Sequence, residues 1–284
     1  MKSAFLIVAH GNFDMLKCLI KSLDYADNAM FIHIDKKCGD IDYTQFESIA
    51  KHSHVECLQD RMSVTWGGVS QIKCTFKLLK CAVPHKYNYY HLISGVDYPL
   101  MSNEDLSQFL DRNNGCEYVG FANERKDLKD KLGYYHFFID SRNRLMKRAG
   151  GILIKIQKIM GIRQYKDIDY FAKGCNWWSI THGLASALLE REKEIIRKYR
   201  FSLCCDEFFV QTFIKHHPIW IDKLYCNKDE YQGCMRMIDW NRGNPYVFTL
   251  NDIDEVAGCK MFFIRKVKNV SVMNEIEKYR KKND

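Results

Sequence analysis

Two adjacent acidic residues, Asp206 and Glu207, come directly before an apolar stretch that is typical of a helix from Phe208 to Ile214. The free backbone N–H groups and the dipole at the start of a helix favour ionised carboxylates. An ionised glutamate can remove a proton from an attacking hydroxyl group, which is general base catalysis. Acidic residues also cap helices routinely, and on these residues alone capping is the favoured interpretation.

Three cations further along the chain could stabilise an anionic leaving group, namely Arg236, Arg265 and Lys266. A guanidinium and an ammonium group together can supply the charge that a metal ion brings to a diphosphate, and arginine adds a bidentate fork. Arg236 and Lys266 are the preferred pair, with Arg265 as an alternative to its neighbour. A solvated surface cation is the ordinary alternative for each of them.

Three Asp-x-Asp patterns could hold Mg²⁺ or Mn²⁺ against a diphosphate. None of them follows a convincing buried strand, so we interpret them as loop or cap residues and predict no metal and no other cofactor. The patterns are Asp40/Asp42, Asp167/Asp169 and Asp252/Asp254.

The elements that must position these residues alternate between strand and helix. Such alternation predicts one α/β domain over residues 1–284, with a mostly parallel, Rossmann-like central sheet and ligands at the carboxyl ends of its strands. Asp35 and Asp97 both stand at such ends. The apolar patterns predict strands at 4–9, 30–35, 89–93 and 176–180, and helices at 13–23, 69–79 and 184–200.

The segment from residue 124 to residue 170 differs from the rest because it is rich in positive charge. Apolar residues between Ile152 and Met160 fall near helical spacing, with lysine and arginine elsewhere around the helix. A helix at a membrane interface and a helix packed on the core with a solvated basic face fit this pattern equally well. We therefore predict a basic insertion that faces solvent, a membrane or the acceptor.

Composition and charge narrow the class of protein. The hydrophobic fraction of 46% excludes a disordered chain, and the net charge of +8 indicates an anionic partner. Nucleic acid, an anionic membrane and a phosphate-bearing substrate all qualify, but no nucleic-acid-binding motif is present. The 12 cysteines contain no C-x-x-C pair, so we interpret them as reduced thiols.

No segment of the sequence predicts export or a membrane span. The apolar run from Ala4 to Ala9 is too short for a signal peptide or a transmembrane helix, and no other stretch without charges reaches that length. We expect a cytoplasmic protein, either free or peripheral on the inner face of the cytoplasmic membrane.

An ordered set of motifs resembles the core-2/I-branching family of glycosyltransferases, which includes β-1,6-N-acetylglucosaminyltransferases and peptide O-xylosyltransferases. The resemblance covers roughly residues 3–268, and the shared order and spacing make the set specific although each motif alone is weak. The motifs are Ala4–His10, His33–Lys37, Ser63–Gly68, Ser94–Pro99, Gly174–Trp178, Asp206–Phe209, Arg236–Trp240 and Phe263–Lys266.

The resemblance implies a GT-A-like fold, a nucleotide-sugar donor and no divalent metal. It implies that Glu207 is the catalytic base and that Arg236 and Lys266, or Arg265, hold the donor diphosphate. The resemblance, together with the positions of residues at the ends of predicted strands, assigns two further groups of binding residues. The nucleotide-binding group is Val8, His10, Asp35 and Trp66, and the sugar- or acceptor-binding group is Asp97, Trp177 and Trp240. His10 could equally be structural, and we assign Trp178 to the core.

The function implied is an inverting, metal-independent transfer of a sugar to a hydroxyl group of an acceptor glycan. The donor is a UDP-sugar carrying GlcNAc, xylose, galactose or glucose. Because no anchor or signal is found, we expect a bacterial-type member in surface-polysaccharide biosynthesis, with an acceptor that could be lipid-linked. The alternatives are a metal-dependent transferase of the same fold and a non-catalytic relative that only binds carbohydrate or nucleotide.

Overall fold

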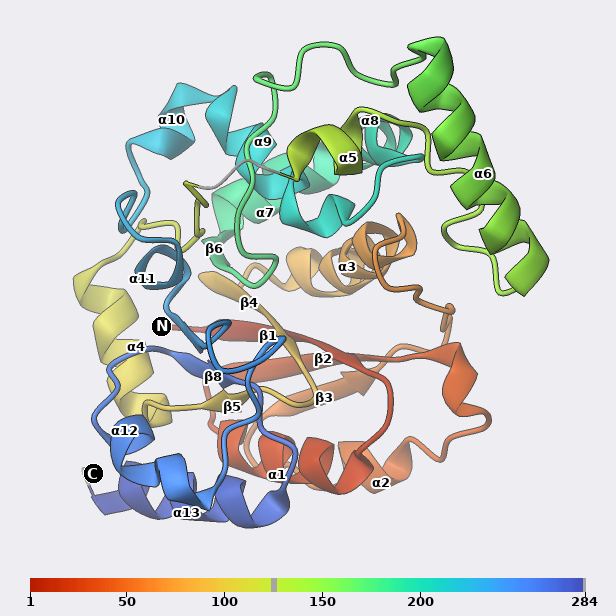
Figure 1. Cartoon of the computed structure of the whole chain (residues 1–284). Coiled ribbons are helices and arrows are strands. Elements are labelled where there is room, and N and C mark those ends of the chain that lie inside the picture. Colours follow the sequence, from red (N-terminus) through yellow and green to blue (C-terminus); the bar gives the residue numbers. More distant parts are fainter. Residues whose placement is uncertain (124–126, 283–284) are drawn as a thin grey trace.

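The computed structural model describes residues 1–123 and 127–282 and contains a five-stranded sheet in the order β3-β2-β1-β4-β6 (Figure 1). Strands β1 to β4 are parallel, and β6 pairs antiparallel with β4. The predicted mostly parallel, GT-A-like α/β sheet is therefore confirmed. The strands are β1 (Ser3–Ala9), β2 (Asn28–Ile34), β3 (His54–Cys57), β4 (Tyr89–Ser94) and β6 (Ser179–Thr181).

Helices cover both faces of this sheet, because alternate side chains of a buried strand point to opposite sides. In β1, Ala4 and Leu6 belong to one apolar cluster, whereas Phe5 and Ile7 belong to another. The first cluster includes residues of α3 (Ser70–Ala82), α7 (His182–Glu190), α8 (Glu192–Tyr199) and α9 (Phe209–Lys215). The second includes residues of α1 (Phe13–Leu23), α4 (Asn103–Arg112) and α13 (Val270–Lys282).

A second, three-stranded sheet has the order β5-β8-β7 and lies beside the carboxyl end of β4. Its strands are β5 (Tyr98–Pro99), β7 (Arg236–Ile238) and β8 (Phe263–Arg265). The β5–β8 pair is antiparallel and the β7–β8 pair is parallel. This sheet fixes the segment that contains β7 and β8 against the end of the main sheet.

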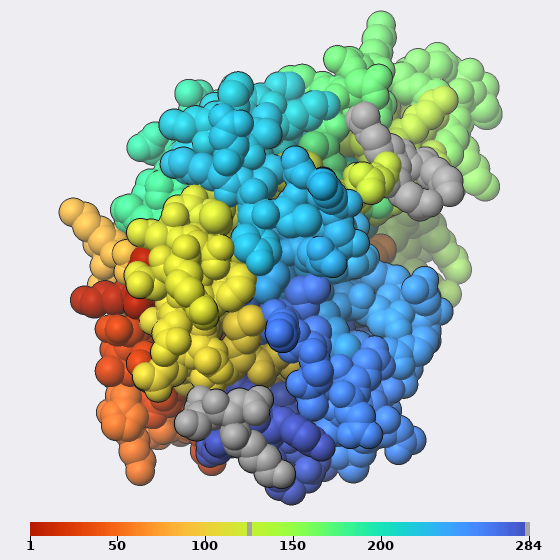
Figure 2. All heavy atoms as spheres, turned by 90° about the vertical axis from the view of Figure 1, so that its left-hand side faces the viewer, coloured from red at the N-terminus to blue at the C-terminus, as the bar shows by residue number. Residues whose placement is uncertain are grey.

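Short helices complete the fold. They are α2 (Thr44–Glu47), α5 (Leu128–Leu132), α10 (Pro218–Ile221), α11 (Glu230–Cys234) and α12 (Ile253–Ala257). Figure 2 shows one face of the molecule, on which the yellow segment that contains α4 lies beside the cyan segment that contains α10. The backbone of Glu117, which follows α4, bridges to Leu224 across this boundary.

Two predicted elements differ from the structure. The helix expected over 184–200 is two helices, because Arg191 between α7 and α8 leaves helical geometry at φ −98° and ψ 10°. The strand expected over 176–180 pairs only from Ser179 onward, although the Trp178 carbonyl still accepts a hydrogen bond from the Leu92 N–H at 2.9 Å.

The basic segment contains one long helix, α6 (Arg144–Met160), which lies at the edge of the molecule in Figure 1. Residues 124–126 of that segment lie outside the described residues. Within the described residues, no helix has the length and apolar composition needed to cross a membrane. All twelve cysteines are free thiols, as expected.

Candidate active site

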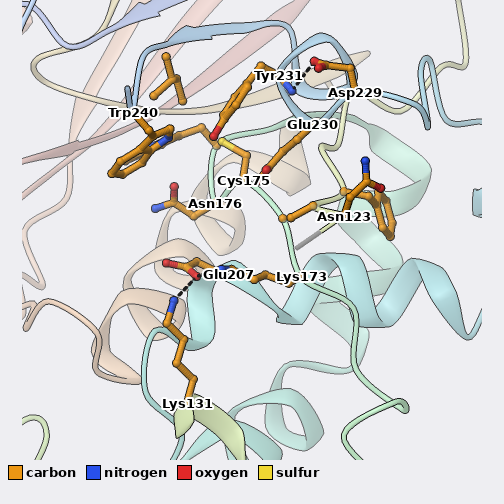
Figure 3. A pocket seen from close by; sticks show the side chains of 15 residues that line it. Asn123, Lys131, Lys173, Cys175, Asn176, Glu207, Asp229, Glu230, Tyr231 and Trp240 are labelled. Carbon is orange, nitrogen blue, oxygen red and sulfur yellow. Dashed lines mark hydrogen bonds and ion pairs between the residues drawn. The ribbon is translucent and has the colours of Figure 1, made fainter. Parts of the chain in front are cut away.

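A cleft of about 570 Å³ opens between α5, the end of the 3₁₀ turn Cys205–Glu207 and the start of α11. Figure 3 shows Glu207 and Lys131 on one side of this cleft and Trp240 and Tyr231 on the other. Its lining residues come from segments far apart in the sequence. They are Phe121, Ala122, Asn123, Lys131, Lys173, Gly174, Cys175, Asn176, Trp177, Glu207, Asp229, Glu230, Tyr231, Ile238 and Trp240.

The carboxylate of Glu207 faces this cleft with one oxygen paired and the other open. Its Oε2 lies 2.6 Å from the Lys131 Nζ and 3.8 Å from the Lys173 Nζ. Both lysines also pair with Asp127, at 2.7 and 2.9 Å. No described residue forms a hydrogen bond with the Glu207 Oε1. One oxygen therefore remains available to accept a proton from a bound hydroxyl group.

Lys131 is held in this position by two carboxylates. Burial alone would lower its pKa, but hydrogen bonds to Asp127 and Glu207 raise it overall. The ammonium therefore stays charged and gives the carboxylate of Glu207 a permanent counter-charge.

The backbone around Glu207 is fixed by a close approach to the segment that contains Gly174. The Gly174 N–H donates to the Glu207 carbonyl at 2.9 Å. A Cβ on Gly174 would lie only 1.8 Å from the Gly120 carbonyl oxygen, so a glycine is needed at this position. The motif Gly174–Trp178 thus packs one wall of the cleft directly behind the glutamate.

Asp206 lies behind Glu207 and does not cap α9, so the capping interpretation is wrong. Its Oδ2 accepts hydrogen bonds from Gln71 at 2.9 Å and from Asn176 at 3.0 Å. Burial, and secondarily the charge of Glu207, raises the pKa of Asp206 to about 6. Asp206 therefore joins α3 to the wall that contains Asn176.

A second glutamate, Glu230, also lines the cleft, and no sequence pattern pointed to it because it lies where a charged loop meets a short helix. It opens α11, where the preceding Asp229 caps the helix through the Tyr231 and Gln232 N–H groups. Burial raises the pKa of Glu230; Lys173 lowers it and Glu207 raises it further. The sequence analysis also missed Lys131 and Lys173, because isolated lysines in a chain rich in lysine and arginine form no recognisable pattern.

Arg265 forms the boundary between this cleft and the carboxyl end of the main sheet. Its Nη1 donates to the Ser94 Oγ at 2.6 Å and to the Asp97 Oδ1 at 2.7 Å. Its guanidinium carbon lies 4.5 Å from the centre of the Trp177 ring, which lines the cleft. Since Ser94 is the strand partner of Val8 at the end of β1, Arg265 links that strand end to the cleft.

Lys266 follows Arg265 and is half-buried. Its ammonium group has no hydrogen bond or ion pair with any residue in the described part of the chain. Burial lowers the pKa of Lys266, and the neighbouring charges of Lys268 and Arg265 lower it further. A cation surrounded by cations would be stabilised by a bound anion, as a diphosphate site requires.

Arg236, which was predicted to hold the donor diphosphate, is buried and is not part of this cationic edge. Only 1% of the residue is exposed. Its guanidinium donates to the carbonyls of Cys234 at 2.7 Å and Trp178 at 2.9 Å, and to the Ser179 hydroxyl at 3.1 Å. It stacks over the Phe263 ring at 4.6 Å. These contacts hold the guanidinium inside the protein, and its Nε is buried without a hydrogen-bond partner among the described residues.

Asp97 does not line the cleft either, contrary to its assignment to the sugar or acceptor. It is buried, and its second oxygen accepts from the Ser94 N–H at 2.8 Å while the first accepts from Arg265. Asp97 therefore positions Arg265.

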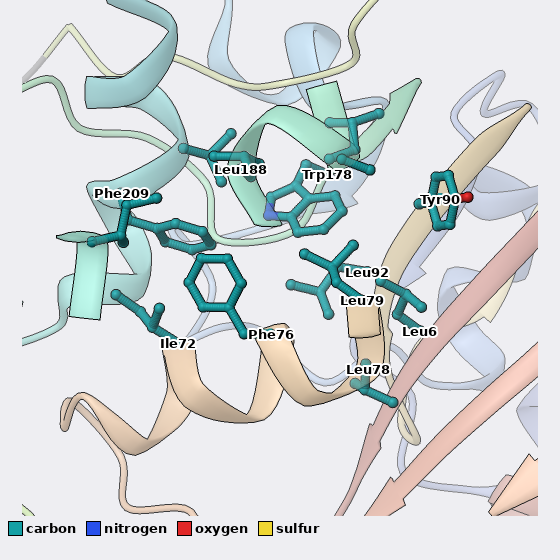
Figure 4. Close-up of a cluster of buried hydrophobic side chains, with 14 of the residues drawn as sticks. Leu6, Ile72, Phe76, Leu78, Leu79, Tyr90, Leu92, Trp178, Leu188 and Phe209 are labelled. Atoms are coloured by element: carbon teal, nitrogen blue, oxygen red, sulfur yellow. The ribbon is translucent and has the colours of Figure 1, made fainter. Parts of the chain in front are cut away.

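Of the predicted tryptophans, Trp177 and Trp240 line the cleft, and Trp240 is 51% exposed. Trp178 lies in the core with residues such as Phe76 and Leu188, as predicted (Figure 4).

The nucleotide-binding group lies near the carboxyl ends of β1 and β2 but outside the cleft described above. Asp35 is buried and accepts hydrogen bonds from the Lys37 and Val64 N–H groups at 2.8 and 3.2 Å. Val8 is the penultimate residue of β1 and is half-buried, whereas His10 is exposed. Trp66 is 77% exposed, which fits both a side chain that stacks on a ligand and one that only faces solvent. Nucleotide binding by these four residues stays a prediction.

The Asp-x-Asp patterns occupy turns and helix starts, as predicted. Asp42 accepts from the Thr44 N–H, and Asp167 accepts from the Asp169 N–H, each at 3.0 Å. Asp252 forms a capping box with Thr249.

Comparison with known proteins agrees with the resemblance drawn from the motifs. The family model described as Core-2/I-Branching enzyme matches residues 3–261. The chain therefore belongs to the core-2/I-branching enzyme family, a family of glycosyltransferases.

Relatives include rat xylosyltransferase 2, which is 22% identical over 269 residues, covering 91% of this chain and 29% of the rat protein. Human xylosyltransferase 1 is 20% identical over 306 residues, covering 98% of this chain and 30% of the human protein. The chain thus spans about 30% of the length of these relatives. Among solved structures, mouse xyloside xylosyltransferase 1 in its apo form is similar with a TM-score of 0.39 and 11% identity, over 96% of this chain and 99% of that one.

Proposed function

We propose that the chain is an inverting glycosyltransferase that moves one sugar from a UDP-sugar to a hydroxyl group of an acceptor glycan, without a divalent metal. The observation that carries this proposal is the pairing of Glu207 with Lys131, which leaves the Glu207 Oε1 open to the cleft. Membership of the core-2/I-branching family supports the same reaction class.

The proposed step is one in-line displacement. The acceptor hydroxyl gives its proton to the Glu207 carboxylate while its oxygen forms a bond to the anomeric carbon. The bond from that carbon to the diphosphate oxygen breaks, and its electron pair leaves with the nucleoside diphosphate. Attack opposite to the leaving group inverts the anomeric configuration. A positioned base of this kind contributes roughly 10²–10⁴-fold to the rate.

Arg265 and Lys266 are proposed to stabilise the diphosphate as it leaves. Arg265 is held by Asp97 and Ser94, and Lys266 beside it is unpaired within the described residues. Fixed positive charge stabilises a developing anion without reorganisation during the reaction. Two cations can in this way replace the metal ion.

We propose that the acceptor binds in the 570 Å³ cleft, with Trp177 and Trp240 as stacking surfaces for sugar rings. UDP-xylose is the first donor to test, because the relatives named above are xylosyltransferases. UDP-GlcNAc, UDP-galactose and UDP-glucose follow. A role in surface-polysaccharide biosynthesis, with an acceptor that is free or lipid-linked, completes the proposal.

The test is to measure donor hydrolysis and transfer for these four UDP-sugars, with and without EDTA. Turnover that EDTA leaves unchanged, with an anomeric configuration opposite to that of the donor, supports the proposal. Turnover that EDTA abolishes and Mn²⁺ restores would establish the metal-dependent alternative. Thermal protection by UDP-sugars without any turnover would indicate a non-catalytic relative.

A further inference from the structure

Helix α6 exposes an apolar stripe that no described part of the protein covers. Nine of the seventeen large apolar side chains that are exposed in the described residues lie between residues 137 and 162. Leu145, Ile152, Ile156 and Ile159 are 70, 58, 41 and 86% exposed. Their spacing of seven, four and three residues places them on one face of the helix.

Cations border this stripe along one side. Arg148 and Lys155 each follow a stripe residue by three positions, and Arg144 lies one turn before Arg148. All three are exposed and have no hydrogen bond or ion pair with a described residue. The sequence from residue 142 to residue 166 contains eight lysines and arginines and no acidic residue. The exposed face of α6 is therefore apolar along its centre and purely positive beside it.

The opposite face of α6 fixes the helix to the protein. Gln157 is buried and exchanges two hydrogen bonds with the Tyr135 backbone, at 2.8 and 3.0 Å. Gly150 packs so closely that a Cβ would lie 2.7 Å from the Phe137 carbonyl oxygen. Lys158 pairs with Asp130 of α5 at 2.9 Å, one residue before the Lys131 that contacts Glu207. The direction of the apolar stripe is thus set relative to the cleft.

We propose that α6 is a membrane-docking surface that lies flat on an anionic lipid leaflet, with the stripe in the headgroup region and the cations on lipid phosphates. Burial of apolar side chains and attraction to anionic lipid together drive such binding. A second copy of this chain is a poorer occupant, because two α6 faces bring only positive charges together and offer no carboxylate. This proposal does not depend on the transfer reaction.

The test measures binding of the whole chain to phosphatidylcholine vesicles with and without phosphatidylglycerol. The wild-type chain binds only the anionic vesicles, and salt weakens the binding because it screens surface charge. The double substitution Ile152→Ser and Ile159→Ser lowers the partition coefficient by about tenfold or more. The double substitution Arg148→Gln and Lys155→Gln also lowers the partition coefficient on anionic vesicles.

Matched controls carry the same changes elsewhere on the surface. Ile219→Ser with Ile221→Ser on α10 removes two residues that are 62 and 40% exposed, and leaves vesicle binding unchanged. Equal binding by the α6 and α10 variants, or no binding by the wild-type chain, overturns the proposal. The membrane-docking proposal is also overturned if sedimentation shows a dimer of the wild-type chain that dissociates when the α6 isoleucines are substituted. Because all these positions are exposed, melting temperatures should stay constant and exclude misfolding as an explanation.

Discussion

Glu207 and Glu230 share one cleft, but their surroundings give them different chemical properties. Lys131 and Lys173 pair with Glu207. No described side chain forms an ion pair with Glu230, and burial raises the pKa of this glutamate. A general base must be ionised when the acceptor binds. We therefore assign proton removal to Glu207, and contact with the acceptor's other hydroxyl groups to Glu230.

Replacing Glu207 by glutamine should lower kcat by roughly 10²–10⁴-fold, because an amide cannot take up the proton. Binding of the UDP-sugar should change little, since the donor contacts are proposed to lie at Arg265 and Lys266. Steady-state kinetics and donor titration measure the two quantities. Glu190→Gln, on the exposed end of α7, is the matched control. A Glu207→Gln variant with full kcat would remove this residue from the reaction.

Lys266→Ala should weaken binding of UDP by roughly 10- to 100-fold, the usual effect of losing one charge-assisted contact. Lys268→Ala removes a lysine two residues away that is exposed, and should have a much smaller effect. Calorimetric titration of UDP against both variants gives the comparison. Equal weakening by the two substitutions would mean that only the general positive field matters.

At the residue scale, the sequence predicted the anionic and cationic sides of the site but not all of their members. Glu207, Trp177 and Trp240 do line the cleft, and Arg265 borders it. The burial of Arg236 was not predicted, because sequence alone cannot distinguish an arginine that binds carbonyls inside the protein from one that binds a ligand. Its flanking strand residues offered no sign that the side chain turns inward.

At the element scale, the buried Arg236 connects the two sheets. It starts β7, donates to the Trp178 carbonyl and Ser179 hydroxyl at the beginning of β6, and stacks on Phe263 of β8. Without the guanidinium, the Trp178 carbonyl would keep only the Leu92 N–H and the Ser179 hydroxyl only the His91 ring, and the Cys234 carbonyl would lose its donor from Arg236. Unpaired buried polar groups cost about 1–3 kcal/mol each.

Arg236→Met should therefore lower the free energy of unfolding by several kcal/mol, roughly 2–5, because the hydrogen bonds from the buried guanidinium to these acceptors are lost. Donor affinity of the protein that remains folded should be close to that of the wild type. Chemical denaturation and UDP titration separate the two effects, with Arg197→Met on the exposed side of α8 as control. A stable variant that fails to bind UDP would instead return Arg236 to the donor site.

Most of the central elements were predictable because continuous apolar runs and helical periodicity describe fully buried strands and amphipathic helices. The α1, α3 and β4 predictions agree with the structure within a few residues. The second sheet was not predictable, because its strands have two or three residues each and pair only through long-range contacts. Such strands are too short to show alternation.

At the scale of the whole molecule, stability should depend on pH through Glu117. This residue is fully buried, and its carboxylate accepts from the Thr181 N–H at 2.8 Å and from the Thr181 hydroxyl. Burial raises the pKa of Glu117 from 4.5 to about 7, against the opposing effect of the Thr181 hydrogen bonds. Above about pH 4.5 the unfolded chain loses this proton while the folded protein keeps it until about pH 7.

The free energy of unfolding should therefore fall as pH rises from about 4.5 to 7, on the order of 3 kcal/mol from this group, and then level off. Glu117→Gln cannot ionise, so the variant should lack this part of the decline. Urea denaturation at several pH values, compared with Glu190→Gln, tests the difference. Parallel curves for the wild type and Glu117→Gln would show that Glu117 titrates normally.

The second sheet also has a consequence for the order in which the protein is made. Strands β1 to β4 leave the ribosome before β8 and can pair with one another, whereas Tyr98 of β5 must wait for Ile264 of β8. Domains assemble as their segments emerge. Arg265 and Lys266 therefore reach their places only after strands β1 to β4 have been made, and a nascent chain halted before residue 263 should hold its main sheet yet fail to retain UDP.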